Sequence, residues 1–231
     1  MTLVERRHTL STEQDPVWLQ IGLFITEILK IFLGAFLGAV CAFAYERKSK
    51  AAEDKFRHSK AIRDTQFGLI DRITTLMNII DQHMVSQEAN PHRWVELSPF
   101  LHAYNLSPLP VAELSFLLDG IDPNLVQEVQ IVSHKFDTVQ QLIQVRNAAH
   151  DEFQRWHEQN QMSPRLQVHL VRFTDALYDQ APDTVLDMNR VFQRLGDTMS
   201  NHFRGINKLD LGDEVKQKIE GLQNKTATIK P

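Results

Sequence analysis

Residues 17–45 read VWLQIGLFITEILKIFLGAFLGAVCAFAY, a run that is apolar around most of a helical circumference. An α-helix rises about 1.5 Å per residue, so roughly 20 residues cross the hydrocarbon core of a bilayer. Trp18 and Tyr45 stand near the two ends, where aromatic side chains anchor a span at the membrane interface. Asp15 and Pro16 suit the cap and first turn of a helix. The stretch predicts a single transmembrane helix, and the alternative is a buried helix of a soluble protein.

Charged residues flank this span unequally. Arg6 and Arg7 precede it, whereas a basic run follows it directly, consisting of Arg47, Lys48, Lys50, Lys55, Arg57, Lys60 and Arg63. Because positive charge stays on the cytoplasmic side, we expect residues 1–16 to form a short tail outside and the remainder of the chain to lie in the cytoplasm. The first three basic residues, Arg47, Lys48 and Lys50, would then meet lipid headgroups as interface anchors.

The polar and small residues of the span gather on one side of the helix. At about 100° per residue, this side carries Gln20, Glu27, Lys30, Gly34, Gly38, Cys41 and Tyr45, and large apolar residues occupy the other side. The two glycines form a GxxxG pair, which allows close approach of two helices. Glu27 and Lys30 are one turn apart and can pair with each other or with another copy. The pattern favours self-association along a seam of Gln20, Glu27, Lys30, Gly34 and Gly38.

Two other interpretations of the same face stay open. In the first, Lys30 reaches toward the headgroups, Glu27 neutralises it, and the glycines are incidental. In the second, Gln20, Glu27 and Lys30 line a water-filled pore.

The composition excludes several classes of protein. The 231 residues carry a formal net charge of −4 and one cysteine, Cys41. A single cysteine excludes an intramolecular disulfide and a cysteine-based zinc site, and the mild acidity gives no general reason to expect nucleic-acid binding. The apolar run is too long for a cleavable signal. With no Gly-rich phosphate loop, nucleophile elbow or metal-ligand spacing, the sequence predicts no cofactor, no metal and no small-molecule substrate.

Beyond the span, the chain has helical periodicity and no competing strand pattern. Apolar residues at helical spacing predict a helix from Glu46 to about Met84 that continues the span. Proline-containing pairs mark a connector and the starts of further helices. The predicted elements are the connector 87–110, a short helix 111–118, and helices that begin at 123, 164 and 182, the last ending near 205. Residues 46–210 are predicted as an antiparallel helical bundle, and residues 211–231 as a polar tail with at most one weak helix.

The candidate catalytic residues lie in the middle of the helix that begins at residue 123. Arg146 and His150 share a face, where the guanidinium could bind phosphate and the imidazole could act as acid or base. Arg146-Asn147 followed by His150 resembles the hallmark of the HEPN superfamily, helical bundles of which many are RNases. That hallmark has four to six residues between Arg and His, whereas three separate them here. Without the resemblance, such a pair is typical of a solvated face or an inter-helix hydrogen bond.

A membrane helix that leads into such a bundle is similar to the membrane accessory proteins found beside type VI CRISPR effectors. The resemblance implies an all-α, HEPN-like fold in the bacterial inner membrane. It also implies a homo-oligomeric pore that permeabilises the membrane during phage defence, with lipid, RNA or an RNA-guided effector as partners. We expect a protein with no enzymatic activity or only a vestige of it. The alternatives are a membrane-tethered RNase that uses Arg146 and His150, and a passive anchor or scaffold for a soluble partner.

Overall fold

The computed structural model describes residues 16–100, 106–159, 163–203 and 208–229, with the backbone alone for 16–20 and 226–229. Every regular element within these ranges is a helix, and none of the described residues forms a strand. The predicted all-α fold is confirmed. The chain divides into two compact units, residues 1–54 and 55–231, which are described separately.

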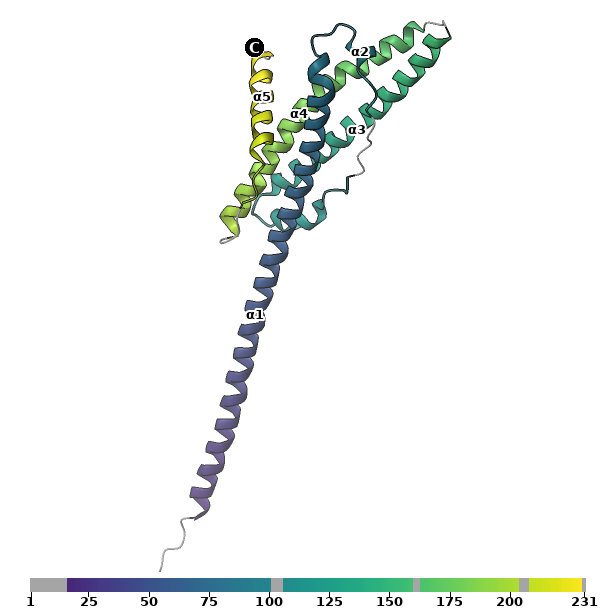
Figure 1. The fold of residues 1–231 in the computed structure, drawn as a ribbon. Helices are drawn as coiled ribbons and strands as arrows, with labels where there is room; N and C mark the ends of the chain where they lie inside the picture. Colours follow the sequence, from purple (N-terminus) through teal and green to yellow (C-terminus); the bar gives the residue numbers. More distant parts are fainter. Residues whose placement is uncertain (1–15, 101–105, 160–162, 204–207, 230–231) are drawn as a thin grey trace, which may run out of the picture. The chain divides into compact units, whose positions relative to one another are not determined.

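The described part of the first unit, from Pro16 onward, is one uninterrupted helix, the beginning of α1 (Pro16–Ile79) (Figure 1). Every side chain described in it, from residue 21 to residue 54, is exposed. The Thr26 hydroxyl donates a hydrogen bond to the Gly22 carbonyl (2.7 Å), so this polar group is paired within its own helix. An α-helix satisfies its backbone polar groups internally, which a segment in hydrocarbon must do.

The described residues of the second unit form the remainder of α1 and seven further helical elements (Figure 1). They are the π-helical turn η1 (Ile80–Met84), the 3-10 elements η2 (Val85–Gln87) and η3 (Val111–Leu118), and the α-helices α2 (Arg93–Glu96), α3 (Pro123–Glu158), α4 (Pro164–His202) and α5 (Asp213–Ile229). The predicted start of α3 is confirmed, because Asp122 caps it by accepting from the Leu125 N–H (3.3 Å) and Pro123 follows at the first turn.

Helices α3 and α4 pack along each other in opposite directions. Near the start of α3, Asp122 pairs with Arg194 (2.7 Å) near the end of α4, and further along α3 Lys135 pairs with Asp187 (2.5 Å). These pairs run in reverse order along the two helices, as antiparallel packing requires. The predicted helical bundle is confirmed at this level.

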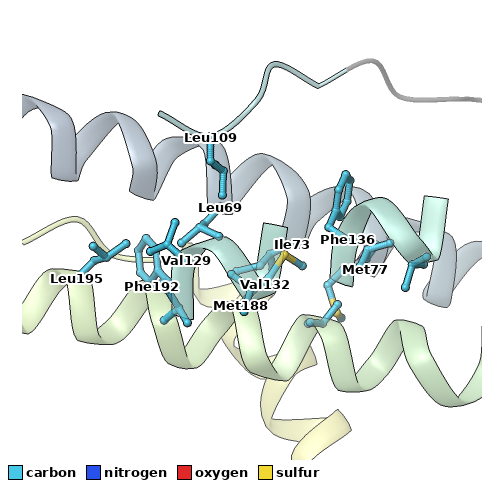
Figure 2. Packing of buried hydrophobic residues seen from close by; sticks show 14 of the residues in the cluster. Leu69, Ile73, Met77, Leu109, Val129, Val132, Phe136, Met188, Phe192 and Leu195 are labelled. Atoms are coloured by element: carbon cyan, nitrogen blue, oxygen red, sulfur yellow. The ribbon is translucent and has the colours of Figure 1, made fainter. Parts of the chain in front are cut away.

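The core lies where α1, α3 and α4 meet, and Figure 2 shows side chains from the three helices directed toward one another. Its labelled members are Leu69, Ile73, Met77, Leu109, Val129, Val132, Phe136, Met188, Phe192 and Leu195. The α3 stripe predicted from periodicity is buried from Leu125 to Phe153, and its last member, Trp156, is 39% exposed. On α1 the apolar residues at helical spacing are covered from Ile62 onward except for Phe67, which is 49% exposed, and Phe56 before them is 70% exposed. The helical spacing of Phe56, Phe67 and Trp156 predicts that they face the core, and this prediction is wrong.

Two predicted elements differ from the structure in the last third of the chain. The helix predicted to begin at Pro182 is instead the continuation of α4, with Pro182 inside it. A proline in a helix interior costs about 3 kcal/mol, because it removes a hydrogen bond and crowds the preceding turn. Leu177, Ala181 and Val185 are buried on both sides of Pro182, and this continuous apolar face offsets the cost.

Helix α5 occupies most of the segment described from sequence as a polar tail. Ile219 of α5 and Leu211 just before it are buried in the core. Lys218 joins Asp81 of η1 and Glu214 of α5, at 2.9 Å in each case. The segment is polar on average, but its few apolar residues lie one turn apart and face the bundle.

Candidate functional site

The apolar part of α1 is the first candidate site. Among the described residues, α1 is the one helix long and apolar enough to cross a membrane, and none of the side chains in its apolar window is buried. The core helix of a soluble protein passes the same test of length and composition, but its side chains are mostly covered by other parts of the chain. Ile31 is 73% exposed and Phe32 74% exposed. These side chains require a cover that the described residues do not supply.

The predicted seam lies on this exposed helix. Glu27, Lys30, Gly34 and Gly38 are all exposed, and within the described part of the chain neither charged residue has an ion-pair partner. A Cβ atom built onto either glycine meets nothing within 4 Å. The seam is therefore open along its length, and its role in self-association stays a prediction. Gln20 belongs to the same face, but its side chain lies outside the described residues.

The predicted interface anchors are also on this helix. Tyr45 is 77% exposed, and Arg47 and Lys48 are exposed. Lys50 pairs with Glu46 (2.7 Å), a surface pair one turn apart. Such a pair contributes little to stability, so it leaves the lysine available to other anions. The side chain of Trp18 lies outside the described residues.

Arg146 is the second candidate and is fully buried, although it lies in the middle of α3. Its guanidinium donates hydrogen bonds to the carbonyls of Ser98 (3.3 Å), Trp94 (3.3 Å) and Leu97. The last two lie in and directly after α2, where the final carbonyls of a helix lack intrahelical donors and carry partial negative charge. The guanidinium carbon lies 5.9 Å from the centre of the Phe100 ring. The guanidinium thus supplies hydrogen-bond donors to the carbonyls at the C-terminal end of α2.

Burial lowers the pKa of Arg146 to about 10, against smaller opposing effects of Tyr178 and Asp151. The side chain is still cationic at neutral pH. No carboxylate of the described residues lies within ion-pair distance of it, so backbone carbonyl dipoles stabilise its charge.

Asn147 and His150 bind the same segment. The Asn147 side chain accepts from the Phe100 N–H (3.2 Å) and donates to the Phe100 carbonyl (2.9 Å). The imidazole of His150 is 8% exposed, and its Nε2 lies 3.1 Å from the Val95 carbonyl. Because a carbonyl only accepts, Nε2 carries the proton in this contact, and in the neutral tautomer Nδ1 does not. Burial lowers the pKa of His150, and the nearby Arg146 lowers it further, while the bond to Val95 and the charge of Asp151 act in the opposite direction.

An apolar cluster completes this arrangement. Trp94 and Val95 of α2 pack on Phe153 of α3 and Leu170 of α4, and the Trp94 and Phe153 rings meet edge to face at 5.4 Å. The three polar side chains and this cluster together hold residues 94–100 against α3. The arrangement is the inter-helix hydrogen-bonding alternative considered from sequence. An RNA phosphate has no access to the buried guanidinium in this conformation, and the catalytic role of Arg146 and His150 stays a prediction.

A second buried arginine was not identified from the sequence. Arg72 of α1 is 3% exposed and donates to the carbonyls of Gly68 (2.9 Å) and Ser107 (2.8 Å). It lies one turn from the buried apolar residues Leu69 and Leu76, and a charged residue at that spacing within a core stripe was the available signal. Arg72 and Arg146 therefore bind the connector between α2 and η3 from its two ends.

Within the described residues, no group of three or more His, Cys, Asp or Glu side chains could hold a metal ion. Comparison with known proteins found no matching family model, no similar curated protein and no similar solved structure. The resemblance to HEPN domains and to CRISPR accessory proteins therefore stays a prediction from the sequence.

Proposed function

We propose that this chain is a single-pass membrane protein that self-associates through α1 and perturbs the bilayer under the control of its helical domain. The observation that carries the proposal is the complete exposure of the apolar part of α1. Burial of apolar surface is worth about 25 cal/mol per Å², so a helix of this composition is strongly driven out of water. The hydrocarbon core of a bilayer would surround the large apolar side chains of this helix.

The open seam supports self-association. A charge near the bilayer centre costs several kcal/mol unless it is paired, reaches the interface or faces water. Glu27 and Lys30 have no ion-pair partner among the described residues, and the face beside Gly34 and Gly38 is unfilled. A second copy of the helix would supply both a close-packed surface and opposite charges. Association of several copies around these polar side chains would weaken the barrier to ions.

The basic run after Tyr45 supports an orientation with the helical domain in the cytoplasm. In that arrangement the domain can receive a signal from a cytoplasmic partner. The resemblance implies the bacterial inner membrane and a defence response to phage as the setting. Both are part of this proposal.

The test uses the full chain in lipid vesicles and nanodiscs. In the seam variant, Gly34→Leu and Gly38→Leu fill the small face. In the matched control, Ala35→Leu and Ala39→Leu introduce leucine at the same spacing, one residue further along the helix. We expect the natural chain and the control to form particles of several copies and to release a trapped dye. The seam variant should be smaller and release at least tenfold less dye.

Three outcomes contradict parts of the proposal. Equal particle size and dye release for the seam variant and the natural chain would favour a passive anchor. Particles of several copies that release no dye would remove the membrane-perturbing role and leave self-association. A chain that stays soluble and monodisperse without detergent would remove the membrane assignment itself.

A further inference from the structure

A cavity of about 250 Å³ lies in the second unit between η1, α4 and α5. Its apolar lining comes from Ile80, Met84, Val85, Pro182 and Leu222, and its polar lining from Glu88, Tyr178, Asp179, Asp183 and Lys225. The cavity is slightly smaller than the ~300 Å³ at which ordinary ligand sites begin. It has the size for a molecule with one ring and a short polar group.

Two irregular helical turns meet at this cavity. On one side η1 is a π-helical turn, in which the Val85 N–H bonds to the Ile80 carbonyl five residues earlier. Such turns are rare and occur frequently at functional sites. On the other side Pro182 has no N–H, so the Tyr178 carbonyl lacks the donor that residue 182 supplies in a regular helix. Both departures from regular α-helical hydrogen bonding therefore lie at the wall of the cavity.

Tyr178 joins the two sides. Its hydroxyl donates to the Met84 carbonyl (2.8 Å), at the residue where the π-helical turn changes into the 3-10 turn. This bond fixes the irregular backbone of η1 against α4. The hydrogen bond therefore holds two walls of the cavity, η1 and α4, together. The base of the cavity is apolar and consists of Ile80 and Met84, which are almost completely buried.

The polar lining is predominantly acidic. Three carboxylates, those of Glu88, Asp179 and Asp183, stand against one ammonium group, that of Lys225. Lys225, the one cation among the described residues of the lining, forms an ion pair with Glu88. Lys135 of α3 lines a neighbouring hollow together with Asp179 and Asp183 and pairs with Asp187. The two aspartates follow one another on α4 beside Pro182, and Asp179 is exposed. An apolar base with carboxylates at its edge is complementary to a cation that carries an apolar group.

We infer that this cavity binds a small organic amine, with the apolar group against Met84 and Pro182 and the ammonium group beside Asp179 and Asp183. The lining of the cavity includes none of Arg146, Asn147 and His150 and no residue of the apolar stretch 17–45. Because η1, α4 and α5 all line it, an occupant contacts three elements of the bundle at once. It would stabilise their packing by binding the folded state.

The experiment uses the full chain in nanodiscs with carbon-13 methyl-labelled methionine, and the Met84 signal is assigned with Met84→Leu. Benzylamine is the probe at pH 7, and benzyl alcohol and phenylacetate are its neutral and anionic counterparts. We expect benzylamine to shift the Met84 signal saturably and with an affinity at least tenfold higher than benzyl alcohol, although the alcohol partitions better into lipid. Phenylacetate should give no saturable shift.

Three variants locate the site. Asp179→Asn with Asp183→Asn should weaken benzylamine at least tenfold. Glu220→Gln, which removes one negative charge from an exposed position of α5 outside the cavity lining, should leave the affinity unchanged. Val85→Trp should block the cavity without altering its charge, and an exposed Val85 makes this substitution compatible with folding. The inference is overturned by the absence of a saturable shift, by equal binding of benzyl alcohol, or by equal losses in the Glu220→Gln and aspartate variants.

Discussion

The guanidinium of Arg146 donates a hydrogen bond to the backbone carbonyl of Leu97, the residue that ends α2. The two residues are far apart in the sequence, and the bond is buried. It makes one side chain of α3 responsible for the position of α2 and the segment after it.

Replacing Arg146 with methionine should destabilise the helical domain. The substitution keeps much of the side-chain volume but leaves three carbonyls, of which that of Leu97 is buried, without this donor, which we expect to lower the free energy of unfolding by about 2–4 kcal/mol. Denaturant unfolding of the detergent-solubilised chain, followed by circular dichroism, measures the change. Arg155→Met, at an exposed position of the same helix, is the control and should change the free energy by less than about 0.5 kcal/mol.

The same variant separates a structural role from catalysis. If Arg146→Met is as stable as the natural chain and abolishes an RNA cleavage that the purified natural chain performs, the membrane-tethered RNase is supported. Absence of cleavage by the natural chain would remove that alternative.

Acidification should weaken the domain through His150. Burial holds the pKa of this imidazole below its ordinary value of 6.5 in the folded chain. Below pH 6.5 the unfolded chain therefore binds the proton more readily than the folded chain, and stability falls as the pH falls toward the folded value. His150→Gln keeps a donor for the Val95 carbonyl but does not titrate. The natural chain should lose more stability between pH 7.5 and pH 5.5 than this variant does, in parallel unfolding curves. Equal losses would contradict the assignment.

Exchange of the charges at positions 27 and 30 should preserve self-association of the helix. If Glu27 pairs with Lys30 of another copy, Glu27→Gln and Lys30→Gln should each weaken association by about 1 kcal/mol, and the reversed pair Glu27→Lys with Lys30→Glu should restore it. Association can be measured by energy transfer between labelled chains diluted in lipid. Thr26→Val, at a position whose hydroxyl bonds within its own helix, should have no effect. Unchanged association in both glutamine variants would favour the interpretation in which Lys30 reaches the headgroups.

Truncation of Phe192 and truncation of Phe56 to alanine should change the free energy of unfolding by very different amounts. Phe192 is completely buried among the residues shown in Figure 2, and Phe192→Ala should lower the free energy of unfolding by about 3–5 kcal/mol. Phe56 is 70% exposed, and Phe56→Ala should stay within about 0.5 kcal/mol of the natural chain. A large loss in Phe56→Ala would mean that another molecule covers this residue.

Features that depend on local sequence were predictable. The start of α3 follows from Asp122 and Pro123, and its buried stripe follows from the spacing of apolar residues. Pro182 was misjudged because a local rule, that proline ends a helix, was outweighed by burial on both sides of it. The polar composition of residues 211–231 hid the few apolar side chains that α5 buries.

The candidate site was predictable only in part. The shared face of Arg146 and His150 follows from their spacing, but the carbonyls that they bind belong to residues 94–98, about fifty positions earlier. The spacing of residues within α3 therefore does not reveal which backbone carbonyls Arg146 and His150 bind. A pair of basic side chains aimed at phosphate and a pair aimed at backbone carbonyls have the same sequence pattern.

The π-helical turn at Ile80–Met84 has a consequence for insertions and deletions in this chain. Its backbone bond spans five residues, where an α-helical bond spans four. A π-helical turn holds one residue more than the α-helical turn it replaces, so deletion of one residue from it restores regular winding and keeps the orientation of the residues that follow. Deletion of one residue from a regular part of α1 within the bundle instead rotates the following residues by about 100°, which turns Glu88 away from Lys225. Changes of a single residue in length are therefore best tolerated at this turn.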